Sequence, residues 1–189
     1  MEEKIKSEEL RVEILNEVHI EAINSFHSYE EELMDFLIED ALNQQNRKIS
    51  VTYLWFLRKT NELVAYITLS PDCVKVKKIS SELSKSFRDK GINYKSLPSL
   101  KIGRLCVEDK FLRRGIGTLL IQFALSIAIK ISQQVGCRFL YLDAKRNKDS
   151  SKDVIHFYKK LKFEVYKERD QKETPMYLDI FPYLMELTD

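Results

Sequence analysis

The segment FLRRGIGTLLIQF, residues 111–123, contains the residues best suited to hold an anion. Gly115 and Gly117 stand at the start of an apolar run, directly after Arg113 and Arg114. The first backbone N–H groups of a helix have no intrahelical partner, and a helix N-terminus carries roughly half a positive charge. Glycines remove the Cβ atoms that would keep a phosphate away from these groups. The pattern therefore predicts a phosphate-binding turn, with a plain tight turn as the alternative that spacing leaves open.

Two better-known glycine-rich loops are excluded by the same residues. A dinucleotide-binding fingerprint needs a third glycine, and position 120 is Leu120. A phosphate loop of the Gly-Lys-Ser/Thr type needs a lysine after its second glycine, and Thr118 stands there instead. The turn belongs to neither class.

A strand before the turn and a helix after it would position it. The run LKIGRLCVE (100–108) predicts the strand, and a long apolar run (115–135) predicts a helix packed on more than one side. Alternating and helical patterns predict further strands at 11–16, 48–57, 63–70, 137–144, 163–168 and 175–180, and helices at 28–46, 80–90 and 150–163, the last capped by Ser150 or Ser151. Pro71 is expected to end the hairpin formed by the second and third of these strands.

This order of elements predicts a single α/β domain over residues 1–189. We expect a mixed, mostly antiparallel central sheet of about 6–7 strands flanked by helices, with residues 72–98 as a largely irregular insertion. An exposed edge strand of such a sheet makes a homodimer one expectation.

Charge is distributed unevenly along the chain. The chain is 44% hydrophobic and 32% charged, which is typical of a globular protein. Residues 1–45 hold 13 acidic and 3 basic residues, whereas Lys75–Lys95 holds 7 basic and 2 acidic ones. The later part of the chain thus favours an anionic ligand, or presents a solvated basic face. The first residues are charged and resemble no signal peptide, so we expect a cytoplasmic protein without a membrane span.

The cysteines and histidines do not predict a metal site. Cys73, Cys106 and Cys137 lie far apart, and the 3 histidines are not spaced as ligands. We expect reduced thiols, and a solvent-facing His156. Cys106 is expected to be a small buried apolar residue.

The segments RLCVEDKFLRRGIGTLLIQFALSIA, RFLYLDA and VIHFYKKLKFEVY together resemble the GNAT superfamily of acetyl-coenzyme A-dependent N-acyltransferases. The resemblance covers residues 100–163 well, which would be the cofactor-binding core, and the preceding hairpin more loosely. It implies an acetyltransferase (EC 2.3.1 class) that uses acetyl-CoA, without a metal, to acetylate a primary amine on a small molecule or macromolecule.

The resemblance also implies roles for particular residues. In the family, the strand matched by Leu105, Cys106 and Val107 pairs with the pantetheine arm. The turn matched by the following positions binds the pyrophosphate: Arg113, Arg114, Gly115, Ile116, Gly117 and Thr118. The tyrosine of the FY pair, here Tyr158, commonly protonates the departing thiolate; as a phenol it is protonated at neutral pH. Its other interpretation is a core aromatic on an apolar helical stripe.

The sequence departs from the family pattern at two positions. Leu112 stands where the family usually has Gln or Arg, and Lys162 stands where it often has the glycine that ends a helix. Neither change removes a group that the chemistry needs.

The general base and the acceptor are left open. Glu108, Asp109 and Asp143 follow strands that could approach the site, but they are interpreted first as surface charges or helix-end partners. A backbone N–H at 105–107 would serve as oxyanion donor if a bulge turned it inward.

A narrower resemblance connects IGRLCVEDKFLRRGIG to the acetyltransferase toxins of bacterial toxin–antitoxin pairs, which acetylate aminoacyl-tRNA. This resemblance implies tRNA as a partner. A non-catalytic CoA-binding module and a nucleic-acid-binding module are the alternatives from other classes.

Overall fold

The two runs around residues 58–62 form the predicted hairpin. In the computed structural model, which describes residues 3–146, 154–166 and 173–186, β2 (Val51–Leu57) pairs antiparallel with β3 (Leu63–Lys75). The Leu57 amide donates to the Glu62 carbonyl at 2.9 Å, which closes the turn. Across the strands, the buried Thr52 and Thr68 hydroxyls are 2.8 Å apart and satisfy each other.

The sequence predicted that Pro71 would end the hairpin, and this prediction is wrong. Strand β3 continues through Pro71 to Lys75. The reason lies in the register, because Leu69 is the last β3 residue opposite β2, where it faces Val51. Beyond that point a missing N–H removes no hydrogen bond to β2, so a proline is tolerated there.

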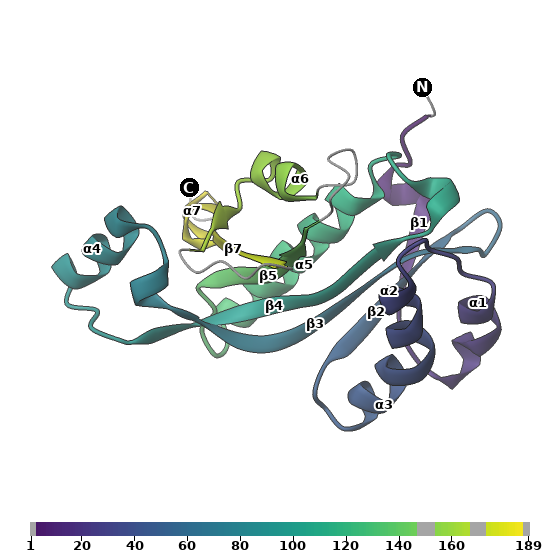
Figure 1. The fold of residues 1–189 in the computed structure, drawn as a ribbon, viewed down its shortest axis with the longest axis horizontal. Coiled ribbons are helices and arrows are strands. Elements are labelled where there is room, and N and C mark those ends of the chain that lie inside the picture. The colour runs from purple at the N-terminus through teal and green to yellow at the C-terminus, as the bar shows by residue number, and fades with distance from the viewer. Residues whose placement is uncertain (1–2, 147–153, 167–172, 187–189) are drawn as a thin grey trace. The chain divides into compact units, whose positions relative to one another are not determined.

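A seven-stranded sheet with the order β1-β2-β3-β4-β5-β7-β6 confirms the predicted fold class (Figure 1). Its remaining strands are β1 (Leu10–Ile14), β4 (Ser96–Val107), β5 (Phe139–Lys145), β6 (Glu164–Val165) and β7 (Glu173–Asp179). The pairs β1–β2, β5–β7 and β6–β7 are antiparallel, as expected. The helices are α1 (Ile20–Asn24), α2 (Glu31–Asp35), α3 (Ala41–Asn46), α4 (Ser81–Asp89), α5 (Ile116–Ser132), α6 (Ile155–Lys160) and α7 (Phe181–Met185). The helix predicted over 28–46 is divided into α2 and α3 by a π-helical turn (Phe36–Asp40), and α4, α5 and α6 lie within the other three predicted helices. The short helices α1 and α7 were not predicted.

Residues 72–98 are more ordered than the sequence suggested. The end of β3 and the start of β4 enclose α4 in this segment, and the Val76 amide donates to the Lys95 carbonyl at 3.0 Å. Helix α4 coincides with the helix expected near 80–90, and Ser80 caps it by accepting from the Leu83 amide at 3.3 Å. The caps expected at Ser150 and Ser151 lie outside the described residues.

Chain contacts divide the molecule into two units. The first unit contains residues 1–70 and 102–123, and the second contains 71–101 and 124–189. The core of the first unit lies between β2, β3 and the helices α1–α3, which Figure 1 shows gathered beside β2. In the second unit, Phe87 and Tyr177 both pack edge-on against Phe139, at centroid distances of 6.3 and 5.7 Å.

No helix within the described ranges is both long enough and apolar enough to cross a bilayer.

Candidate active site

The predicted phosphate turn has the backbone shape that its sequence implies. Gly115 has a φ of 87°, and Arg113 has a φ of 61°, so both are in the left-handed region. A side chain at position 115 would be strained in this conformation. Arg113 bears that strain, a cost of roughly 1–2 kcal/mol for an L-residue, which is typical of functional turns. Left-handed residues in a turn help to converge successive amides into a concave anion site.

Helix α5 begins directly after the left-handed glycine. The Thr118 amide donates to the Gly115 carbonyl at 3.1 Å, so the helical hydrogen bonding starts there. The amides of Ile116 and Gly117 precede it in the first turn, where no intrahelical acceptor exists. Gly117 is helical and does not have a positive φ, so backbone conformation does not require glycine there. What glycine offers at this position is the absence of a side chain.

The N-terminal segment supports the turn, which the sequence did not predict. The Ile5 amide donates to the Arg114 carbonyl at 3.0 Å, and the Arg114 Nε donates to the Glu3 carbonyl at 3.1 Å. The Lys4 Cγ lies 4.0 Å from the position that a Gly115 Cβ would take. Arg114 is therefore partly engaged by the protein, whereas the Arg113 side chain is exposed.

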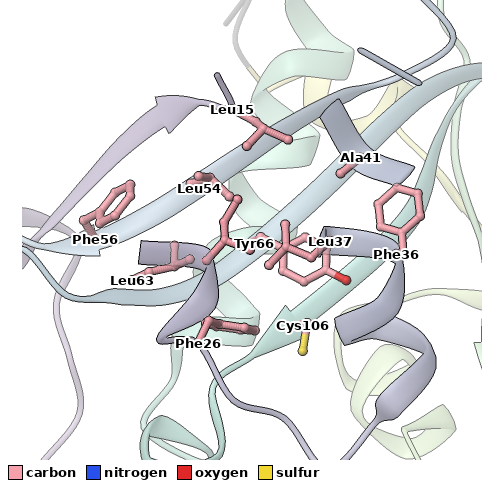
Figure 2. Packing of buried hydrophobic residues seen from close by; sticks show 11 residues of the cluster. Leu15, Phe26, Phe36, Leu37, Ala41, Leu54, Phe56, Leu63, Tyr66 and Cys106 are labelled. Atoms are coloured by element: carbon pink, nitrogen blue, oxygen red, sulfur yellow. The ribbon is translucent and has the colours of Figure 1, made fainter. Parts of the chain in front are cut away.

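The strand before the turn buries one of its predicted site residues. Cys106 is 4% exposed and packs in the first-unit core with Tyr66 and Phe26, as Figure 2 shows. Burial raises the pKa of its thiol to about 12, so Cys106 is protonated and is no nucleophile. Its predicted role as a small buried residue is confirmed. Leu105 and Val107 are half-buried, and strand alternation places their side chains on the opposite face from Cys106.

Glu108 contradicts the expectation of a surface charge. Its side chain is buried, its amide donates to the Val64 carbonyl at 2.9 Å, and Lys110 Nζ lies 3.4 Å from its Oε1. Its Oε2 has no hydrogen-bond partner among the described residues. Burial raises the pKa of Glu108, and the nearby Lys110 opposes this. Glu108 follows the last residue of β4, and its burial matches the alternation in which Cys106 is buried and Val107 is half-buried.

The other acidic candidates have structural partners or lie at the surface. Asp143 pairs with Lys101 at 2.8 Å and accepts a hydrogen bond from the Tyr141 hydroxyl at 2.8 Å. Asp109 is exposed. Asp109 is thus the surface charge that the sequence predicted, whereas Asp143 is a half-buried strand residue with partners on strands and is neither a surface charge nor a helix-end partner. His156 is exposed, as predicted.

Tyr158 lies in the second unit, on α6. It is 8% exposed, with Phe157 and Phe163 at ring-centroid distances of 5.1 and 5.7 Å. Burial raises the pKa of Tyr158 to about 12, so its hydroxyl carries a proton at neutral pH. These ring contacts agree with the core-aromatic interpretation of Tyr158, and the same residue is a protonated phenol.

The backbone carbonyl of Tyr158 accepts a hydrogen bond at the C-terminal end of α6. Lys162 has a φ of 66°, its amide donates to the Lys159 carbonyl at 3.0 Å, and the Phe163 amide donates to the Tyr158 carbonyl at 3.1 Å. These two bonds form a Schellman motif with a lysine at the position that usually holds glycine. The helix end keeps its conformation despite the residue change.

A model of the acetyltransferase (GNAT) family matches residues 15–163, a range that includes the turn and Tyr158. The chain belongs to this family. As a GNAT acetyltransferase it is an acyltransferase that uses acetyl-CoA. None of the described residues form a cluster suited to a metal ion. No curated protein matches the chain.

Solved structures similar to this GNAT chain cover nearly all of it. The structure of AtaTR bound with AcCoA has 26% identity and a TM-score of 0.73, covering 96% of this chain and 99% of the other. AtaT complexed with acetyl-methionyl-tRNAfMet has 24% identity and a TM-score of 0.77, covering 95% and 99%. An AtaT mutant toxin bound to the C-terminus of the antitoxin AtaR has 22% identity and a TM-score of 0.71, covering 96% and 99%.

The turn fits the pyrophosphate of acetyl-CoA. Its left-handed Gly115, the side-chain-free Gly117 and the exposed cation of Arg113 are features that a close-lying diphosphate requires. The sequence predicted these turn residues, but it did not predict the support from Ile5 and Lys4, because nothing in a charged N-terminal run indicates a contact with so distant a part of the chain.

Proposed function

We propose that this acetyltransferase acetylates the primary amine of aminoacyl-tRNA. The observation that carries the acetyl-transfer part is the turn at residues 113–118, with its left-handed Gly115 at the start of α5. The acceptor part is supported by the full-length likeness to AtaT, which has been seen with acetyl-methionyl-tRNAfMet. The basic segment Lys75–Lys95 supports it independently, because polyanionic RNA requires such a surface.

The residues of the turn bind and orient the donor. Arg113 and the amides of Ile116 and Gly117 hold its pyrophosphate, and Thr118 and Arg114 complete the turn. The backbone of Leu105–Val107 aligns the pantetheine arm, and an amide of this strand is the oxyanion donor if a bulge turns it inward. Acetyl-CoA supplies the thioester whose acetyl group is transferred.

The reaction moves one acetyl group and one proton. The amine nitrogen forms a bond to the carbonyl carbon, and the carbon–sulfur bond breaks. The nitrogen loses a proton, and the sulfur gains one. We assign the delivery of the proton to sulfur to Tyr158, whose buried hydroxyl is protonated at neutral pH. The raised pKa keeps the hydroxyl protonated at neutral pH, and it also makes Tyr158 a weaker acid than a free phenol.

A mass-spectrometric acetylation screen tests this function. The protein and acetyl-CoA are incubated with aminoacyl-tRNA, a polyamine, an aminoglycoside and a peptide with a free N-terminus. We expect the mass of one acetyl group to appear on the aminoacyl moiety alone. The matched control is the same tRNA with its amino acid already N-acetylated, which should remain unchanged.

Two results would count against the proposal. Acetylation of a small amine, with aminoacyl-tRNA unmodified, would keep the enzyme class but overturn the acceptor. Release of no free thiol with any amine, despite binding of CoA, would make the chain a CoA-binding module.

A further inference from the structure

A hollow lined by cations lies in the second unit, between α4 and the ends of β3 and β4. Its volume is about 650 Å³, within the range of small-molecule sites. Its charged lining residues are Lys75, Lys77, Arg88 and Lys95, and none of the lining residues that the structure describes is acidic. We call it the basic hollow.

An aromatic and an apolar side chain complete the lining. Tyr94 is 71% exposed, an unusual position for a tyrosine in a folded protein, and Ile92 lies near it in the chain. An exposed ring next to several cations provides both a face for stacking and partners for phosphate.

The walls of the hollow are held by specific contacts. The Lys75 amide donates to the Tyr166 hydroxyl at 2.6 Å, and the Val76 amide donates to the Lys95 carbonyl at 3.0 Å. On α4, Arg88 Nη1 donates to the Ser84 Oγ at 3.2 Å, which orients the guanidinium. The cations therefore project from an ordered backbone.

We propose that the basic hollow binds an unpaired nucleotide of the RNA acceptor, with its base stacked on Tyr94 and its phosphates on the four cations. This inference rests on the proposed function and names the surface that recognises the acceptor. Single-stranded RNA is recognised by this combination of stacking and charge. An acidic peptide would use the cations but would gain little from an exposed ring.

The test measures binding of deacylated tRNA by fluorescence anisotropy over a series of salt concentrations. Tyr94→Ala should weaken binding by about 5- to 160-fold, the range expected for loss of one stacked base. Tyr94→Phe keeps the ring and should bind like wild type. Neutralising Lys75 and Lys95 to Gln should reduce the slope of log K against log salt by roughly 0.7–0.9 for each phosphate that the variant no longer neutralises.

The matched control is the double variant Lys85→Gln, Lys90→Gln. Both lysines are exposed in the same segment but do not line the hollow, so the net charge changes equally. We expect this control to keep most of the wild-type affinity and slope. An equal loss in both double variants would show a diffuse basic face and overturn the proposal.

Three combinations of binding and acetylation results distinguish a failure of this inference from a failure of the proposed function. If aminoacyl-tRNA is acetylated but Tyr94→Ala has unchanged affinity and KM for tRNA, the hollow is not the RNA site while the function stands. If tRNA binds with the predicted dependence on Tyr94 but is not acetylated, the function fails while the hollow stands. If a poly-glutamate peptide binds more tightly than tRNA, independently of Tyr94, the hollow is a peptide site and the proposal is wrong.

Discussion

The Ile5 amide donates a hydrogen bond to the Arg114 carbonyl at 3.0 Å, which ties the N-terminal segment to the phosphate turn. Ile5 is buried, so this contact is shielded from water. The N-terminal segment is thus part of the support of the site, although it lies outside the residues that match the family model.

Replacing Ile5 tests this support. Ile5→Pro removes the donor and should weaken CoA affinity by about 3- to 10-fold, the loss that corresponds to one net hydrogen bond of roughly 1 kcal/mol. Isothermal calorimetry measures the affinity. Ile5→Val keeps the amide and most of the apolar side chain, and should bind nearly as wild type. Equal affinities for the proline variant and wild type would show that the hydrogen bond does not support the turn.

Gly117→Glu tests the turn itself. A carboxylate in the first turn of α5 would occupy the space of the pyrophosphate and repel it, so CoA binding should fall below detection in calorimetry. The helical conformation of Gly117 accepts a side chain, so the melting temperature should stay within a few degrees of wild type. Gly117→Ala is the matched control for size. Wild-type affinity in the glutamate variant would remove the turn from the cofactor site.

The positions that were predicted well have strong local signals. The alternation in the β2–β3 hairpin, the glycines at the start of α5 and the apolar run of α5 each depend on a few neighbouring residues. The predictions that failed depend on distant parts of the chain. Pro71 lies beyond the last β3 residue that pairs with β2, and no local pattern reports that register.

Burial was the hardest property of the site to predict. Glu108 is charged and precedes a turn, which favoured a surface position, yet it is 3% exposed. The basic segment was predicted, but its hollow depends on the hydrogen bond between Val76 and Lys95, at opposite ends of that segment. The basic composition of this surface can be predicted from the sequence. Its concave shape cannot, because it depends on tertiary contacts.

Lys162→Gly should stabilise the protein. Lys162 adopts a left-handed φ of 66°, which costs an L-residue roughly 1–2 kcal/mol, and glycine adopts it freely. Part of the gain is offset by the greater freedom of glycine in the unfolded chain, so we expect a net increase of about 0.5–1 kcal/mol in the free energy of unfolding. Denaturant titration measures it. Lys160→Gly, in the last helical position, should destabilise; stabilisation by both would refute the cap as the cause.

Glu108→Gln should change how stability depends on pH. Burial raises the pKa of Glu108 in the folded protein above its unfolded value, so the folded state holds the proton more tightly. Stability therefore falls as pH rises from the unfolded pKa through the folded one, and wild type carries this cost at neutral pH. The glutamine variant should melt higher than wild type at pH 7.5, and the gap should shrink towards pH 4. A lower melting temperature at pH 7.5 would show that the Lys110 pair outweighs burial.

Tyr158→Phe tests the assignment on which the proposed chemistry depends. The substitution removes one hydroxyl and keeps the ring that packs against Phe157 and Phe163, so the fold should be unchanged. The measurement is steady-state acetylation of aminoacyl-tRNA, with kcat and the KM for acetyl-CoA determined for variant and wild type. We predict that kcat falls by roughly 100-fold or more, the usual contribution of a general acid, with little change in KM. A kcat equal to that of wild type would contradict the account and leave Tyr158 as a packing residue of α6.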